Sequence, residues 1–307
     1  MLPTQPTPIA PAAAPDGARN FFPARFSAEA FMGLPFTLIL LSLLVQPLIY
    51  FLMAHALGAA WSVNLDQRVD QAMAALRAPA LIHPALWITF LGGPIMVTTV
   101  TLIMLISLWL RQQSSYILPL SVAVTGCGLY TLLGKALFPR IRPPDAVYTT
   151  EASLSFPSGH AAQAITAYGF ILYFLWRTRK TRGGRVLLLL SGSLVIAAII
   201  FSRIYLSVHY LSDVGSGVLM GSAWLAIGIA ISRWRFAHVA REEPEGFRPL
   251  TVRAALGALL AVELALYLFT GSRFIAAALP HGVAAALQTS DVHRYPPPRA
   301  SGLQGES

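Results

Sequence analysis

The 307-residue chain is 55% hydrophobic, has only 11% charged residues and carries a formal net charge of +9. This balance is too apolar for a soluble domain of such length and indicates a polytopic membrane protein. The basic residues gather in short stretches between apolar runs, which argues against a nucleic-acid partner, and the single cysteine, Cys127, excludes a disulfide framework within the chain and a multi-cysteine metal site.

Apolar runs of roughly 17–25 residues, the length that crosses a bilayer as a helix, recur along the sequence. About seven runs meet this length criterion, and they begin near Pro35, Pro84, Ser115, Gly159, Val186, Tyr210 and Ala254. The runs are continuous and do not alternate, which excludes a β-barrel, and a helix satisfies every backbone amide in lipid. We therefore expect an all-α membrane bundle with about six core transmembrane helices and one extra C-terminal helix.

The two ends of the chain differ in composition from the apolar middle. Residues 1–30 open with a Pro- and Ala-rich stretch, and residues 290–307 are similar, so both ends are expected to be disordered. Between them we expect a membrane core over residues 31–235, followed over residues 236–289 by a cytoplasmic linker and the extra helix. The first apolar run is long enough to stay as an anchor, so no cleavable signal peptide is expected.

A short amphipathic helix is expected between the first two spans, in the stretch NLDQRVDQAMAALRAP at residues 64–79. Val69, Met73, Ala74 and Leu76 recur there at helical spacing, with acidic residues early and an arginine late. Such a helix is suited to lie on the outer surface of the membrane.

Basic residues distinguish the two sides of the membrane. The strongest cluster is RTRKTRGGR at residues 177–185, and the next extends from Arg233 to Arg253. Cytoplasmic loops are enriched in Lys and Arg, so both clusters are expected inside the cell, together with the N-terminus and residues 111–114. Alternation of the spans then leaves three loops outside, at residues 58–83, 139–157 and 203–209.

Ionisable residues at the ends of the spans fall into three groups, and each such residue is costly there and is a functional candidate. The groups are KALFPRIRPP with Lys135 and Arg142, FPSGH with His160, and SRIYLSVHYLSD with Arg203, His209 and Asp213. In this topology all three groups lie at the outer ends of their helices, so they can meet.

Each group also has a simpler explanation. Lys135 and Arg142 alone are typical of span-end cations that extend to the interface, and His160 alone is typical of an interfacial histidine. His209 and Asp213 are harder to explain in this way, because at four residues apart on a helix they share a face. The carboxylate can then hold the Nδ1 proton and leave Nε2 as a free lone pair.

Taken together, the groups place permanent cations, histidines and a carboxylate at one membrane depth. A lipid-facing surface would not tolerate so many polar groups, whereas a binding site for a multiply charged anion requires them. Lys135, Arg142 and Arg203 supply the charge that a phosphoryl group requires without a metal. The sequence therefore predicts a phosphate site with no cofactor and no metal.

The FPSGH stretch is expected to add a helix start to this site. Pro157 is typical of a first helical position, so the amides of Ser158, Gly159 and His160 are expected to be unpaired and to point outward. Glycine allows the anion to approach closely.

The three groups in this order, K-x6-R-P, P-S-G-H and S-R-x5-H-x3-D, resemble the signature of the type 2 phosphatidic acid phosphatase family, which also includes the vanadium haloperoxidases. The signature positions are all filled, by Lys135, Arg142-Pro143, Pro157-Ser158-Gly159-His160, Ser202-Arg203, His209 and Asp213. The resemblance covers roughly residues 35–232 and leaves the last span outside. It implies a helical bundle, a metal-free site and a phosphohistidine intermediate.

The resemblance also implies roles for these residues. His209 would attack phosphorus, Asp213 would fix its tautomer, and His160 would protonate the leaving oxygen and then activate water. The remaining residues would hold the phosphoryl oxygens, and they are Lys135, Arg142, Ser158, Gly159 and Arg203. Arg140 is not a signature position and is interpreted as an interfacial cation, and Glu263 in the last apolar run is expected outside the site.

The expected substrate is a lipid phosphate, because an outer site between helices admits a headgroup while the tail stays in the bilayer. The family implies undecaprenyl diphosphate, phosphatidylglycerol phosphate, phosphatidic acid or lipid A phosphates, hydrolysed on the periplasmic side of a bacterial inner membrane. Two alternatives stay open: a lipid phosphotransferase with the same intermediate, and a non-enzymatic transporter of phosphate lipids. A transporter site is expected nearer the bilayer midplane, and phosphate release without an added acceptor distinguishes hydrolysis from transfer.

Overall fold

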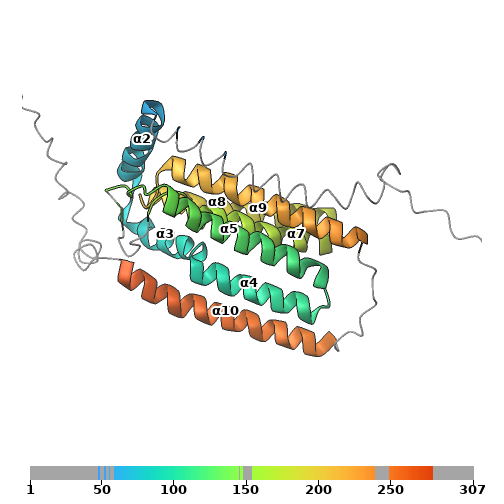
Figure 1. Ribbon diagram of the computed structural model, residues 1–307. Helices are drawn as coiled ribbons and strands as arrows, with labels where there is room; N and C mark the ends of the chain where they lie inside the picture. Colours follow the sequence, from blue (N-terminus) through green and yellow to red (C-terminus); the bar gives the residue numbers. More distant parts are fainter. Residues whose placement is uncertain are drawn as a thin grey trace, which may run out of the picture.

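The computed structural model describes residues 59–144, 146–147, 154–238 and 249–278, together with Leu48, Leu52 and His55. These residues form helices and connecting turns without any strand, which confirms the all-α expectation (Figure 1). The helices are α2 (Ala60–Leu76), α3 (Pro79–Leu91), α4 (Pro94–Leu110), η1 (Ser114–Tyr116), α5 (Ile117–Leu137), α6 (Gly159–Gln163), η2 (Ala164–Tyr168), α7 (Gly169–Thr178), α8 (Arg182–Tyr205), α9 (Leu211–His238) and α10 (Pro249–Ala278). The ends expected to be disordered lie outside the described residues, and so does most of the first expected span.

Four helical segments in the described part of the chain are long and apolar enough to cross a membrane. They cover Ser114–Leu137, Arg182–Tyr205, Leu211–Ala237 and Gly257–Ala278. Helices α3 and α4 add a fifth if they form one span, and they meet at an angle of 47°. The bend falls at Gly92 and Gly93, between the end of α3 and Pro94 at the start of α4. The run expected to begin near Pro84 is therefore a bent pair.

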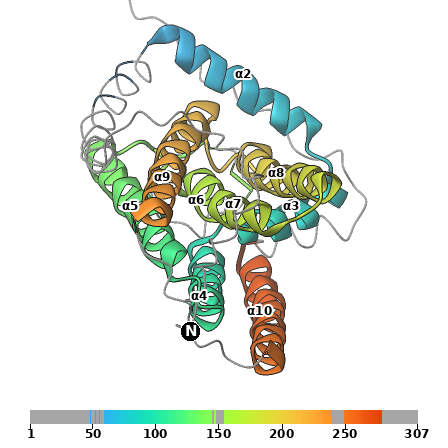
Figure 2. The same cartoon turned by 90° about the vertical axis from the view of Figure 1, so that its right-hand side faces the viewer.

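The run expected near Gly159 differs from the other spans because it lies inside the bundle. It forms α6, the π-helical turn η2 and α7 in succession, and it is not among the segments that are long and apolar enough to count as spans. Helix α6 contacts α5, α8 and α9, and Figure 2 shows it among them. Small residues such as Ala161, Ala162 and Ala164 are fully buried there. Because neighbouring helices surround it, this run needs fewer large apolar residues than a lipid-facing helix.

Two glycines of α9 allow α6 to approach closely. A β-carbon on Gly217 would overlap the carbonyl oxygen of Ser158, and one on Gly221 would overlap that of Ala162. Small residues permit this kind of backbone contact between membrane helices. The start of α6, which carries His160, is thereby seated directly against α9.

Replacing Gly217 by alanine is expected to lower thermal stability, because the added methyl group must push the start of α6 away from α9. Overpacking of this kind costs roughly 1–3 kcal/mol. Gly215→Ala is the matched control on the same helix, since its β-carbon would meet no atom within 4 Å. Thermal unfolding in detergent measures the difference, and equal unfolding midpoints for the two variants would contradict the expectation.

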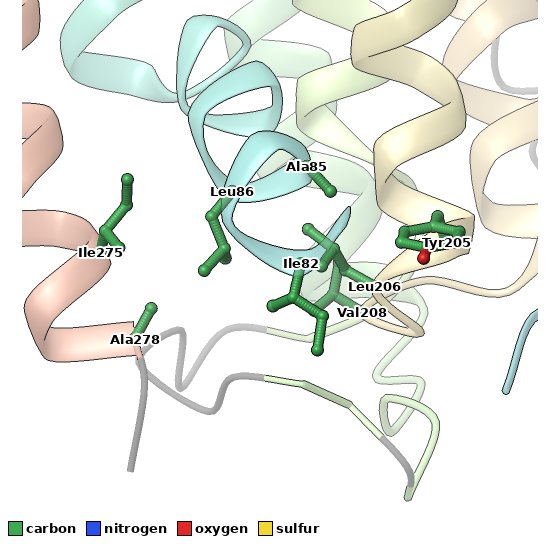
Figure 3. Packing of buried hydrophobic residues seen from close by; sticks show 8 residues of the cluster. All are labelled: Ile82, Ala85, Leu86, Tyr205, Leu206, Val208, Ile275 and Ala278. Atoms are coloured by element: carbon green, nitrogen blue, oxygen red, sulfur yellow. The ribbon is translucent and has the colours of Figure 1, made fainter. Parts of the chain in front are cut away.

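The extra C-terminal helix expected after the core is present as α10, which packs against α3 and α4. A buried apolar cluster joins α3 and α10 to the end of α8 and the turn that follows it (Figure 3). Its members are Ile82, Ala85, Leu86, Tyr205, Leu206, Val208, Ile275 and Ala278. The cluster supports the turn at residues 206–210, which connects α8 with α9 and contains His209.

The expected surface helix is present as α2, which lies across one end of the bundle and contacts α8 and α9 (Figures 1 and 2). Its buried side chains are Ser62 and Asp66, whereas Leu76 of the expected apolar stripe is 67% exposed. Met73 of that stripe packs against the buried apolar cluster, and Ser62 and Asp66 add a polar contact that the apolar periodicity does not predict.

Candidate active site

Backbone hydrogen bonds bring the three motif groups together at one end of the bundle. The Ser155 amide donates to the Arg140 carbonyl at 2.7 Å, which joins the first group to the chain just before FPSGH. The Ser158 amide donates to the Asp213 carbonyl at 3.1 Å, which joins the second group to the third. Residues far apart in the sequence therefore form one site.

His209 lies in the turn between α8 and α9, before α9 begins at Leu211. The chain reverses direction there through Ser207, which adopts a φ of 49°. The expectation that His209 and Asp213 share a helix face is therefore wrong. The two side chains still face each other, with Nδ1 of His209 3.7 Å from Oδ2 of Asp213, which is too long for a direct hydrogen bond.

Arg142 determines the tautomer of His209. Its Nη1 lies 3.2 Å from His209 Nε2 and 2.5 Å from the carbonyl oxygen of Val208. A guanidinium only donates hydrogen bonds, so Nε2 accepts and the ring proton is on Nδ1, on the side of Asp213. In this tautomer Nε2 carries the lone pair that a nucleophile requires.

A serine outside the signature, Ser155, lies between His209 and Asp213. Its hydroxyl donates to Asp213 Oδ2, and its Oγ is 3.4 Å from His209 Nδ1. The Tyr210 amide also donates to Asp213 Oδ2, at 2.9 Å. The only sequence signal for Ser155 is its position directly before FPSGH.

The interpretation of Arg140 as an interfacial cation is wrong, because its guanidinium pairs with two buried carboxylates. Nη1 lies 2.7 Å from Asp213 Oδ1, and Nη2 lies 2.7 Å from Asp66 Oδ2. Burial lowers the pKa of this guanidinium, but the charges of Asp213 and Asp66 outweigh that effect and raise the pKa above its ordinary value. Arg140 therefore stays charged at the back of the His209 site.

Two further signature residues lie against α3, near its break with α4. Arg203 is fully buried and donates from Nη1 to Thr89 Oγ1 at 2.7 Å. The His160 ring lies beside the break, since a β-carbon on Gly92 would be 3.3 Å from His160 Cδ2. Lys135, at the end of α5, donates from Nζ to the Leu154 carbonyl.

Ser158 is the N-cap residue of α6, and Gly159 is its first helical residue. The prediction that the Ser158 amide is left for an anion is wrong, because the Asp213 carbonyl accepts its hydrogen bond. The Ser158 hydroxyl, in contrast, is buried and has no hydrogen-bond partner among the described residues. A buried hydroxyl without a hydrogen-bond partner destabilises the fold by roughly 1–3 kcal/mol. A hydrogen bond from this hydroxyl to a phosphoryl oxygen would remove that cost.

Within the described ranges, no group of three His, Cys, Asp or Glu side chains is placed to hold a metal ion. Glu263 of α10, expected outside the site, takes part in none of the contacts above. Its carboxylate oxygens are buried and have no hydrogen-bond partner in the part of the chain that the structure describes.

Comparison with known sequences finds a family profile and a curated relative. The family profile described as the PAP2 superfamily matches residues 114–237, a range that contains every signature residue. Phosphatidylglycerophosphatase B of Bacillus subtilis (strain 168) is 31% identical over 204 residues, which cover 57% of this chain and 89% of the relative. Helices α2, α3, α4 and α10 lie outside the matched family range.

A solved structure from Bacillus subtilis has a similar fold. The crystal structure of a transmembrane PAP2 type phosphatidylglycerolphosphate phosphatase from Bacillus subtilis superimposes with a TM-score of 0.55 at 23% identity, over 68% of this chain and 98% of that one. LpxE from Aquifex aeolicus reaches a TM-score of 0.41 at 22% identity, over 57% and 97% of the two chains. The Bacillus structure therefore shows that the similarity includes the fold of the helical bundle.

Proposed function

Since the chain belongs to the PAP2 superfamily, we propose that it is an integral membrane lipid phosphatase that forms a phosphohistidine at His209. The observation that carries the proposal is the 3.2 Å contact between Arg142 Nη1 and His209 Nε2. In this contact the lone pair of His209 Nε2 points toward the Arg142 guanidinium. An anion bound by Arg142 therefore lies directly beside the nucleophilic nitrogen. A bound phosphoryl oxygen would replace Nε2 as the acceptor for Arg142 and leave the lone pair available for attack.

In the first step, His209 Nε2 forms a bond to phosphorus while the bond between phosphorus and the leaving oxygen breaks. The leaving oxygen takes a proton from His160, so the lipid departs as an alcohol or, from a diphosphate, as a monophosphate. Arg142, Arg203 and Lys135 neutralise the charge on the equatorial oxygens, with the Ser158 hydroxyl and the Gly159 amide as further donors. Asp213 balances the positive charge that develops on the His209 ring.

In the second step, neutral His160 removes a proton from water as the water oxygen attacks phosphorus. The bond between phosphorus and Nε2 breaks, its electron pair returns to the His209 ring, and inorganic phosphate leaves. His160 ends the cycle with the proton that it lost in the first step, so the two steps together consume one water molecule per phosphate.

The proposed substrate is a lipid phosphomonoester or diphosphate, with phosphatidylglycerol phosphate, phosphatidic acid and undecaprenyl diphosphate as candidates. The name of the Bacillus relative supports the first of these. We place the protein in the bacterial inner membrane with its N-terminus in the cytoplasm and the site facing the periplasm. The basic segment 177–185 supports this orientation, because it joins α7 to the start of α8, whereas His209 follows the other end of α8.

Phosphate release from these lipids by purified protein in detergent tests the proposal. A chelator is present throughout and no acceptor alcohol is added. Release of inorganic phosphate from at least one lipid is the expected result. If phosphate appears only with an added acceptor, the protein is a phosphotransferase, and if no lipid is dephosphorylated under either condition, the proposed function is wrong.

Ser155→Ala is expected to lower kcat by roughly tenfold with little change in KM, because His209 and Asp213 lose the hydroxyl that bridges them while the phosphate ligands stay in place. Steady-state phosphate release measures both constants. Ser191→Ala serves as the control, since the Ser191 hydroxyl donates to the Leu188 carbonyl on exposed helix α8. An unchanged kcat for Ser155→Ala would remove the serine from the mechanism.

A further inference from the structure

Helix α2 is attached to the site end of the bundle by polar side chains at two places. Asp66 is 2% exposed, and its carboxylate accepts from the Ser212 amide at 2.9 Å and from the Ser212 hydroxyl at 2.6 Å. Beyond the other end of α2, Arg77 donates from Nε to the Tyr205 carbonyl at 3.2 Å and from Nη2 to Ser207 Oγ at 2.5 Å. The two attachments contact the chain at Tyr205 and Ser207 before His209 and at Ser212 after it, so α2 spans the segment that holds His209.

A line of alternating charges leads from α2 to the nucleophile. Asp66 Oδ2 binds Arg140 Nη2, and Arg140 Nη1 binds both Asp213 Oδ1 and Ser212 Oγ, each at 2.7 Å. The Arg140 guanidinium also stacks on the Tyr210 ring, 4.2 Å from its centroid. Because the guanidinium is held by the Asp66 carboxylate and the Tyr210 ring, its Nη1 keeps Asp213 Oδ1 in place.

The orientation of Asp213 matters because its two oxygens have different partners. Oδ1 faces Arg140, whereas Oδ2 accepts from Ser155 and faces His209 Nδ1. Rotation of the carboxylate would break the Arg140 contact, so Arg140 holds Oδ2 toward the imidazole. Asp66 supplies the second negative charge, without which the full positive charge of Arg140 would act on Asp213 and weaken its support of the imidazolium.

We propose that α2 belongs to the catalytic apparatus, with Asp66 acting through Arg140 as a positioning residue for Asp213 and His209. The proposal rests on the proposed function, because it concerns the efficiency of His209 as a nucleophile. The side chains of Asp66 and Arg140 bind each other, Ser212 and Asp213, whereas Arg142 binds Val208 and His209. Loss of Asp66 or Arg140 should therefore affect the chemical step and leave substrate binding intact.

The test compares Asp66→Asn, Arg140→Gln and the double variant with the unchanged protein, by kcat, KM and thermal unfolding in detergent. Asp70→Asn is the matched control, since Asp70 is the other carboxylate of α2. We expect Asp66→Asn to lower kcat by roughly tenfold, as is usual for coupled neighbours in one charge network, with KM unchanged and Asp70→Asn near normal. We further expect the double variant to be no slower than Arg140→Gln alone.

Several outcomes would overturn the proposal. A normal kcat for Asp66→Asn, or multiplicative losses in the double variant, would show that Asp66 does not act through Arg140. If Asp66→Asn lowers the unfolding temperature but the folded fraction keeps its kcat, α2 stabilises the fold and has no role in catalysis. If Asp66→Asn does not fold, kcat and KM of Arg140→Lys test the proposal instead. A lysine ammonium cannot replace the planar guanidinium between two carboxylates, so kcat is expected to fall. An unchanged kcat for Arg140→Lys would overturn the proposal. Inactivity of the unchanged protein would instead count against the proposed function.

Discussion

His209→Ala is expected to abolish phosphate release, because no other side chain takes the place of the nitrogen that forms the bond to phosphorus. Loss of a nucleophile that works in a coupled group has cost on the order of 10⁶ in kcat in subtilisin, and an effect of several orders of magnitude is expected here. The variant should still bind the lipid, since Arg142 and the other cations are unchanged. Phosphate release under single-turnover conditions measures the residual rate.

The control for this variant is His83→Ala. His83 is an exposed histidine on α3, so its loss should leave the rate near that of the unchanged protein. Near-normal phosphate release by His209→Ala would exclude His209 as the nucleophile, whatever the other variants show.

His160→Ala is expected to lower turnover of lipid substrates by ~10²–10⁴-fold, the usual cost of losing a general acid and base. The loss should depend on the leaving group, because a nitrophenolate departs without a proton whereas a lipid alkoxide requires one. With p-nitrophenyl phosphate the first step should therefore be largely restored, while the second step stays slow because water is not activated.

This dependence has a kinetic signature that separates His160 from a merely structural residue. Stopped-flow measurement should show a burst of nitrophenolate followed by a slow steady state in His160→Ala, as the phosphoenzyme accumulates. Equal losses for lipid and nitrophenyl substrates, without a burst, would mean that His160 does not transfer protons in this reaction.

The membrane bundle and the candidate residues of the proposed phosphate site could be predicted from the sequence because each has a local signal. Continuous apolar runs identify α5, α8, α9 and α10, and cations or histidines at the run ends identify Lys135, Arg142, His160 and His209. The run that begins near Gly159 is predicted as a span because it is apolar and long enough to cross a bilayer. The structure places its start in the interior, where alanine and glycine suffice.

The residues behind His209 could not be predicted, because their partners are distant in the sequence. Asp66 and Arg140 are separated by the whole of α3, α4 and α5, and no local pattern connects them. The turn geometry was missed for a related reason: a spacing of four residues suggested one helix for His209 and Asp213, yet the reversal at Ser207 ends the helix before His209. Tertiary contact, and not helical register, brings the carboxylate to the ring.

The most direct measurement is chemical trapping of the phosphoenzyme. His160→Ala protein is mixed with p-nitrophenyl phosphate that carries radiolabelled phosphorus, because this leaving group needs no proton from His160. The protein is then quenched in base and digested for peptide mapping. Label on the peptide that contains His209, stable in base and lost in acid as expected of a phosphoramidate, is the predicted result, and His209→Ala should carry none. Phosphate release by the unchanged protein, with no label on His209 under any quench condition, would contradict a phosphohistidine mechanism.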